Sequence, residues 1–188
     1  RYTCNGVINT DDNCLNNMNK ILTSMRGMLV FTSGKYKLKI DKLESATFEF
    51  TESNILGDWT ITGGSKRMIA NKVVARFFDS HNRFIETLSV VSDDSFIEQD
   101  NGFTHEQQLA LHFVSQPQRA NILAQMHLKQ SRQIWTVSFE SNLTGIQVEV
   151  GDVVNITSST AGWTQKPFRV GNIEITNNDI LKFECSEY

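Results

Sequence analysis

The chain has 188 residues, of which 39% are hydrophobic and 21% are charged, and its formal net charge is −3 at pH 7. These values are typical of a globular protein with its own core, and they argue against a protein that binds DNA or RNA duplexes, which usually carries a basic surface. No apolar run of about 18 residues occurs, so we expect no membrane-spanning helix.

The first part of the chain is expected to begin with a strand and a helix. Residues 2–7 alternate between apolar and polar types, which predicts a short strand. The polar residues 9–12 favour a helix start and place acids in its first turn. Apolar residues then recur at helical spacing from Cys14 to Met25, with Cys14 on the apolar face, and Gly27 is expected to close the helix.

A β-hairpin is expected next. Residues 28–32 predict its first strand, Ser33-Gly34 its turn, and residues 36–40 its second strand. The second strand alternates apolar and lysine residues, with Tyr36, Leu38 and Ile40 on one face and Lys35, Lys37 and Lys39 on the other. A solvated lysine face is favoured over an anion-binding face.

Residues 48–50 predict a further strand, and residues 52–56 a single helical turn that ends at Gly57. Residues 1–62 therefore read as an α+β strand–helix–hairpin unit. Gly63-Gly64-Ser65 is the candidate boundary, because the pattern after it becomes β-rich. Residues 63–188 are expected to form a β-barrel-like domain with one packing helix.

In the second part, two apolar runs around residues 79–82 predict a hairpin, and residues 93–102 are interpreted as an acidic surface loop with a turn at Asn101-Gly102. Leu109, Leu111 and Phe113 alternate, as in a strand. Pro117 opens a helix of about residues 117–131. Further strands are expected at 134–139, 153–157, 168–175 and 181–185, with Gly162 and Pro167 in a spacer between two of them.

No residue is assigned a catalytic, cofactor-binding or metal-binding role. The histidines His81, His105, His112 and His127 share no metal-ligand spacing with one another, with cysteine or with acids. The acids between Asp93 and Asp100 miss the alternating pattern of a calcium loop. No phosphate-binding glycine loop, dinucleotide fingerprint or serine-nucleophile motif occurs.

The three cysteines, Cys4, Cys14 and Cys185, form no disulfide or zinc pattern, so we expect reduced structural thiols. The sequons Asn142-Leu143-Thr144 and Asn155-Ile156-Thr157 would permit glycosylation of a secreted protein, but such triplets also arise by chance. Because the chain begins at Arg1 instead of Met, we expect it to be a fragment of a longer protein.

Short motifs in a fixed order carry a family resemblance. They are Arg1-Tyr2-Thr3, Val7-Ile8, Ser33 to Ile40, Phe48 to Thr51, Glu52 to Leu56, Gly57 to Trp59, Gly63 to Lys66, Asn71-Lys72-Val73, Phe77-Phe78 and Glu98 to Gly102. The strongest part comprises Arg119-Ala120, Ser131-Arg132-Gln133, Thr136 to Phe139, Leu143 and Gly151 to Val154. With these motifs the chain resembles the central tail-hub (tip attachment, host-specificity) proteins of lambda-like long-tailed phages and related prophage tail proteins. Gly151 lies between two strand-forming runs, where a turn needs a positive φ, and Val154 and Ile156 are expected to point inward by alternation. Val150, just before this turn, departs from the proline that often stands there in the family.

The resemblance implies a structural protein of the virion, at the distal end of the phage tail. It implies a homotrimer in the full-length hub, which joins the tail tube to a central fibre or spike and lets the genome pass during ejection. The implied partners are the distal tail (tube) protein, the tape measure and the central fibre. No sequence-specific nucleic-acid contact, cofactor or membrane span is implied, and the protein is expected not to be an enzyme.

Two other functions stay open at this point. A tail-associated cell-wall or glycan hydrolase would need two neighbouring carboxylates, such as Glu140 with Glu149 or Asp93 with Glu98. A secreted β-rich receptor-binding module is supported only by the two sequons, and the odd cysteine count weakens it.

Overall fold

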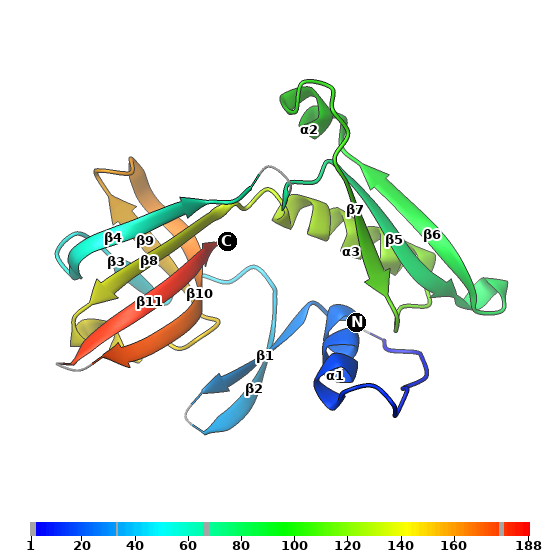
Figure 1. Cartoon of the computed structure of the whole chain (residues 1–188), viewed down its shortest axis with the longest axis horizontal. Helices are drawn as coiled ribbons and strands as arrows, with labels where there is room; N and C mark the ends of the chain where they lie inside the picture. The colour runs from blue at the N-terminus through cyan, green and yellow to red at the C-terminus, as the bar shows by residue number, and fades with distance from the viewer. Residues whose placement is uncertain (1–2, 33, 66–67, 177–178) are drawn as a thin grey trace. The chain divides into compact units, whose positions relative to one another are not determined.

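The computed structural model describes residues 3–32, 34–65, 68–176 and 179–188, and Figure 1 shows its ribbon. The chain forms two compact units. Unit 1 comprises Arg1–Leu29, Leu38–Asp41 and Lys66–Arg132, and unit 2 comprises Val30–Lys37, Lys42–Ser65 and Gln133–Tyr188. This division differs from the contiguous parts 1–62 and 63–188 suggested by the sequence, because strands of the first part pair with strands near the C-terminus.

Unit 1 is built on a three-stranded sheet with the order β6-β5-β7. β5 (Lys72–Asp79) and β6 (Ile85–Ser92) form the expected antiparallel hairpin around a short 3-10 helix, Ser80–Asn82. β7 (Glu106–Leu111) runs parallel to β5. The hairpin prediction from residues 73–90 is therefore confirmed.

Helix α3 (Pro117–Gln130) confirms the predicted helix, with Pro117 in its first turn. It covers one face of the three-stranded sheet, because its apolar stripe packs against alternate residues of β5. The core of unit 1 contains Ala70, Val73, Ala75, Phe77, Leu111, Val114, Ala120, Leu123, Ala124 and Leu128. The packing helix thus belongs to unit 1, whereas the sequence assigned it to the barrel-like domain.

Helix α1 (Cys14–Thr23) confirms the first predicted helix but differs at both ends. Asn13 caps it by accepting the Leu15 N–H (2.9 Å), and no acid lies in its first turn. Its C-cap is Ser24, since Gly27 already belongs to the next strand. Cys14 is exposed, so its expected place on a buried face is wrong.

The strand expected at residues 2–7 is absent over residues 3–7, and Tyr2 lies outside the described residues. Apolar alternation over so short a segment does not supply a strand partner. Here the backbone of the segment joins unit 1 through the Asn5 N–H, which donates to the Phe113 carbonyl (3.1 Å).

Helix α2 (Asp94–Gln99) replaces the acidic surface loop expected from the sequence. Asp93 caps it by accepting the N–H groups of Ser95 (3.0 Å) and Phe96 (3.3 Å), and Asp94 lies in the first turn. Acids at these positions stabilise a helix N-terminus. The predicted turn follows, with φ of 57° at Asn101 and 81° at Gly102.

Strands β1 (Gly27–Thr32) and β2 (Lys35–Ile40) form the expected hairpin, with Ser33 outside the described residues. Its faces are reversed relative to the prediction, because Tyr36 is 72% exposed while Lys37 is half-buried. The Lys37 Nζ lies 2.7 Å from each carboxylate oxygen of Glu149. The lysine face of β2 is thus the more covered one, and Lys37 on it forms an ion pair with Glu149.

Unit 2 is a six-stranded sheet with the order β3-β9-β10-β11-β8-β4. The strands are β3 (Phe48–Phe50), β4 (Ile55–Gly63), β8 (Trp135–Ser141), β9 (Val153–Ser158), β10 (Trp163–Thr176) and β11 (Ile180–Glu187). Phe50 on edge strand β3 lies 4.9 Å, ring to ring, from both Phe139 and Phe183, and Trp59 on the opposite edge strand packs against the same core. The sheet therefore curls around one core, and the predicted α+β, β-rich class is confirmed (Figure 1).

Two local predictions in unit 2 need correction. Pro167 lies inside β10, opposite Asn155 of β9, instead of in a spacer. The Pro167 carbonyl accepts the Tyr188 N–H (3.2 Å), and the register of β10 with β11 begins at Phe168. A proline is tolerated there because its missing N–H falls at the end of that hydrogen-bond ladder. The helical turn expected at residues 52–56 ends earlier: the Thr51 carbonyl accepts the N–H groups of Asn54 and Ile55 (3.1 Å each), but Ile55 already pairs with Ser141, so Leu56 lies in β4.

The three tryptophans of the chain form an aromatic group in unit 2. The ring of Trp163 lies 5.9 Å from Trp59 and 6.2 Å from Trp135. The ammonium group of Lys166 lies 4.9 Å from the Trp163 ring and 2.8 Å from the Glu187 carboxylate. In the described ranges, no helix is long and apolar enough to cross a membrane.

Candidate functional site

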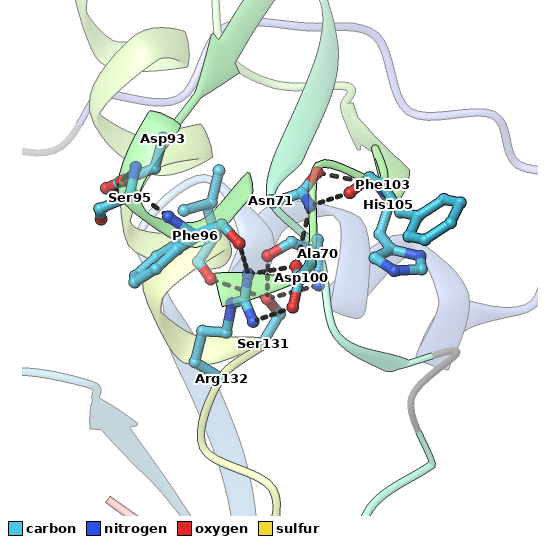
Figure 2. Close-up of polar contacts among 11 residues, drawn as sticks. Ala70, Asn71, Asp93, Ser95, Phe96, Asp100, Phe103, His105, Ser131 and Arg132 are labelled. Atoms are coloured by element: carbon cyan, nitrogen blue, oxygen red, sulfur yellow. Dashed lines mark hydrogen bonds and ion pairs between the residues drawn. The ribbon is translucent and has the colours of Figure 1, made fainter. Parts of the chain in front are cut away.

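Hydrogen bonds in unit 1 join segments that are distant in the sequence into one polar cluster (Figure 2). The polar cluster comprises Ala70, Asn71, Phe96, Asp100, Phe103, His105, Ser131 and Arg132. Three motifs of the family resemblance meet here, at residues 71–73, 98–102 and 131–133. The fold thus gives these motifs a common structural role.

Asn71 is the centre of the polar cluster and is fully buried. Its side-chain nitrogen donates to Asp100 Oδ2 (2.8 Å) and to the Phe103 carbonyl (2.7 Å). Its side-chain oxygen accepts the His105 N–H (2.8 Å). A buried amide with these bonds satisfied holds the loop after α2 against the start of β5.

Arg132, directly after α3, forms two parallel bonds with Asp100, at 3.0 Å and 2.6 Å. Its guanidinium carbon lies 4.4 Å from the centre of the Phe96 ring, a cation–π contact. The hydrogen bond from Arg132 lowers the pKa of Asp100 against the opposing effect of burial, and the bond from Asn71 lowers it further. Asp100 is therefore a carboxylate at neutral pH.

Ser131 connects the end of α3 to the residue before Asn71. Its hydroxyl accepts the Ala70 N–H (3.0 Å) and donates to the Leu128 carbonyl (2.7 Å). Together with the Arg132–Asp100 pair, it fixes the ends of α2 and α3 and the start of β5.

The polar cluster is better suited to fixing the ends of helices than to transferring protons. A general acid needs a raised carboxyl pKa at neutral pH, whereas the pKa of Asp100 is lowered. The pKa of nearby Asp93 is lowered as well, chiefly by the hydroxyl of Ser95. Both carboxylates serve as hydrogen-bond acceptors that fix helix ends.

The histidines lie apart in structural roles. His127 Nε2 lies 3.2 Å from Gln107 Oε1, and burial lowers the pKa of His127. His81 Nδ1 lies 3.3 Å from Asp79, while His105 and His112 are exposed. Within the described part of the chain, no three histidine, cysteine or acidic side chains gather as a metal site would require.

The carboxylates considered for a hydrolase are placed as follows. Asp93 caps the start of α2, and Glu98 is exposed near the end of the same helix. Glu140 is exposed on β8, whereas both oxygens of Glu149 are bonded to Lys37. Two of the four acids are thus already held by structural contacts.

Of the three cysteines only Cys185 lies in the core, and both sequons lie in folded segments. Cys185 is buried, which raises the pKa of its thiol to about 12, and Cys4 and Cys14 are exposed free thiols. The Asn142 side chain accepts the Thr144 N–H (3.2 Å). Asn155 lies on β9 between Glu49 of β3 and Pro167 of β10. A strand flanked on both sides is a poor acceptor for a glycan, which is normally attached at a surface loop.

The turn at Gly151, in the strongest motif of the resemblance, has the backbone that the sequence predicted. Gly151 has φ +85°, and its N–H donates to the Val170 carbonyl (2.7 Å). Asp152 Oδ2 accepts the Glu149 N–H (3.0 Å). Val154 and Ile156 are fully buried, as their alternation suggested.

From the sequence, Asn71 and Arg132 have no role beyond the resemblance. The available signals were an amide directly before an apolar strand and an arginine directly after a helix. Both are common on protein surfaces, so neither indicates burial by itself.

Comparisons with known proteins place the chain. Residues 16–173 match the Phage-tail_3 family model, described as "Putative phage tail protein". Baseplate hub protein pb3 of Escherichia phage T5 is 26% identical over 184 residues, which cover 98% of this chain and 19% of that protein. Tip attachment protein J of Escherichia phage SECphi27 is 24% identical over 160 residues, which cover 85% of this chain and 13% of that protein. The chain therefore spans less than a fifth of either relative.

Two solved structures share the fold. A chain of the virion of a native gene transfer agent particle superposes with a TM-score of 0.82 at 11% identity, over 97% of this chain and 40% of that chain. The 43 kDa tail protein of prophage MuSo2 from Shewanella oneidensis gives a TM-score of 0.59 at 12% identity, over 90% of this chain and 52% of that chain. Because the family model matches well over half of the sequence, the chain belongs to the Phage-tail_3 family of phage tail proteins.

Proposed function

We propose that this chain is a structural module of the central hub at the tail tip of a long-tailed phage or prophage. In this role it helps to join the tail tube to the central fibre or spike, and the complete protein forms a homotrimer through which the genome passes. The observation that carries the proposal is the match of 98% of the chain to a protein named as a baseplate hub.

The described residues support a holding role. The charged groups of the polar cluster fix helix ends, and the core of unit 2 is rich in aromatic side chains. We propose that the module carries out no reaction, since Asp93 and Glu149 are committed to a helix cap and an ion pair. The proposed partners are a distal tail (tube) protein, the tape measure and the central fibre.

Fab fragments raised against this chain test the location. We expect them to label purified tails at the distal tip, as seen by negative-stain electron microscopy. Pre-immune Fab fragments are the control, and labelling along the tube or at the head would contradict the proposal.

Light scattering on the complete protein tests the assembly state. The expected mass is that of three copies, and a stable dimer or hexamer would contradict the hub assignment. Release of cell-wall or glycan fragments by the same preparation, lost in a Glu149→Gln variant, would contradict the structural role.

A further inference from the structure

The two sheets differ in how their edge strands are protected. In unit 2, edge strand β3 has only three residues, and edge strand β4 contains a register shift between Leu56 and Thr60, where Gly57 has φ +64°. Short strands and bulges are devices that prevent an edge from pairing with another chain. Both edges of this sheet are therefore blunted.

Edge strand β6 in unit 1 lacks these devices. It pairs with β5 without interruption from Ile85 to Ser92, and it contains no lysine, arginine or proline. In the ranges that the structure describes, no strand pairs with its outer side. An eight-residue regular edge of this kind offers backbone N–H and C=O groups to an added strand.

The side chains of β6 add an apolar surface beside this edge. Leu88 and Val90 are 56% and 54% exposed, and they point away from α3 because they lie opposite Arg76 and Val74 in the register. Phe78 is 38% exposed on the same face. Together Phe78, Leu88 and Val90 form the apolar face of the sheet.

The charges on this face are matched within the chain. Arg76 lies 4.0 Å from Glu86, and Lys72 lies 2.8 Å from Glu106. With the charges paired internally, the face suits an uncharged partner instead of an acidic or basic one.

The edge at β7 is less open to a second copy of the same sheet. Leu109 and Leu111 of β7 line a cavity of about 210 Å³ whose other wall includes Arg26 and Met28. Arg26 and Met28 of unit 1 itself therefore lie across this cavity from β7, and a β6 strand of another copy that paired with β7 would have to fit beside them.

We propose that the outer edge of β6 binds an extended, uncharged strand of a different tail protein by strand addition. The added strand places apolar side chains at alternate positions, beside Leu88 and Val90. This inference rests on the proposed function, since it takes the partner to be a tail component.

Hydrogen–deuterium exchange tests the edge directly, with the complete protein compared free in solution and within purified tails. Alternate amides of β6 point outward, and we expect their exchange to slow by at least about tenfold in tails. The blunted edge of β4 is the internal comparison and should show a smaller change. Equal exchange of β6 amides in the two samples would overturn the proposal.

A charged variant tests the apolar face. Val90→Lys introduces a charge at a half-exposed position, and Ile122→Lys on α3 is the matched control, because Ile122 is 50% exposed. We expect both variants to keep the melting temperature of the wild type. Each variant is then supplied to a phage that lacks the gene, and plaques are counted. Because assembly needs the added strand, Val90→Lys should give at least about 100-fold fewer plaques than Ile122→Lys.

The remaining outcomes are also decisive. Equal rescue by both variants would overturn the proposal. If the free complete protein had a lower assembly mass as Val90→Lys than as wild type, the strand bound at β6 would come from a second copy. That result would contradict a different tail protein as the partner. Fab labelling at the tail tip together with unprotected β6 amides would leave the hub function standing and remove only this inference.

Discussion

Replacing Asn71 with alanine should destabilise unit 1 strongly. The substitution removes two bonds to neutral backbone groups, Phe103 O and His105 N–H, and one bond to the charged Asp100. At about 1 kcal/mol for each neutral bond and about 2 kcal/mol for the charged one, the free energy of unfolding should fall by about 4 kcal/mol. For a chain of this size, that corresponds to a fall in melting temperature of about 8–16 °C.

The structure offers a way to locate the effect. All three tryptophans lie in unit 2, whereas α1, α2 and α3 lie in unit 1. Urea unfolding followed by far-UV circular dichroism should therefore shift more in Asn71→Ala than unfolding followed by tryptophan fluorescence. Gln125→Ala, which removes an exposed bond to Asn121, is the control and should change stability by no more than about 0.5 kcal/mol. A loss below about 1 kcal/mol in Asn71→Ala would refute the argument that the buried amide holds the polar cluster.

Three further substitutions test other contacts. Gly151→Val should cost about 1–3 kcal/mol in chemical denaturation, because φ is +85°, and a midpoint equal to wild type would remove this turn from the architecture. Lys166→Met should cost about 1–3 kcal/mol, because Glu187 then keeps only the bond from the Trp135 N–H (3.1 Å). The double variant with Glu187→Leu should recover only part of that loss, since it also removes the acceptor of this N–H; no recovery would argue against the ion pair. Asp100→Asn should lower the stability of the protein at neutral pH but not in acid. The pKa of Asp100 is lower in the folded state than the value of about 3.9 in the unfolded state, so the carboxylate stabilises the fold above about pH 3.9. This contribution is lost as the pH falls through the folded-state pKa. The difference in melting temperature between the wild type and Asp100→Asn should be smaller near pH 3 than at pH 7. An equal difference at the two pH values would contradict this explanation.

Local sequence signals predicted most elements of the chain. The apolar spacing in α1 and α3, the alternation in β5 and the glycine at position 151 each depend on neighbours within a few residues. Pro117 is an example, since a proline in the first helical turn removes only an N–H that would have no helical partner. Such elements hardly depend on the rest of the chain.

Most of the wrongly predicted elements depend on pairing with distant strands. The strand expected at residues 2–7 had alternation without a partner, and Pro167 was placed in a spacer although it pairs with Asn155 of β9 and its carbonyl accepts the Tyr188 N–H. Strand pairing is non-local, so the sequence around a strand does not reveal how many neighbours it has. The acidic residues 93–100 show the opposite case, because Asp93 was an available N-cap signal that the loop interpretation overlooked.

The sequence by itself determined the β-rich class, the residue range of the packing helix and the family resemblance that the family model confirms. Only the tertiary structure decided the division into units, because β3 and β4 join strands from the other end of the chain. It also decided the polar cluster, since Asn71, Asp100 and Arg132 are each ordinary surface residue types until three distant segments come together, which buries Asn71 fully and the other two in part. Burial changes their role because a polar group removed from water must find its partners within the protein, and those partners lie far away in the sequence.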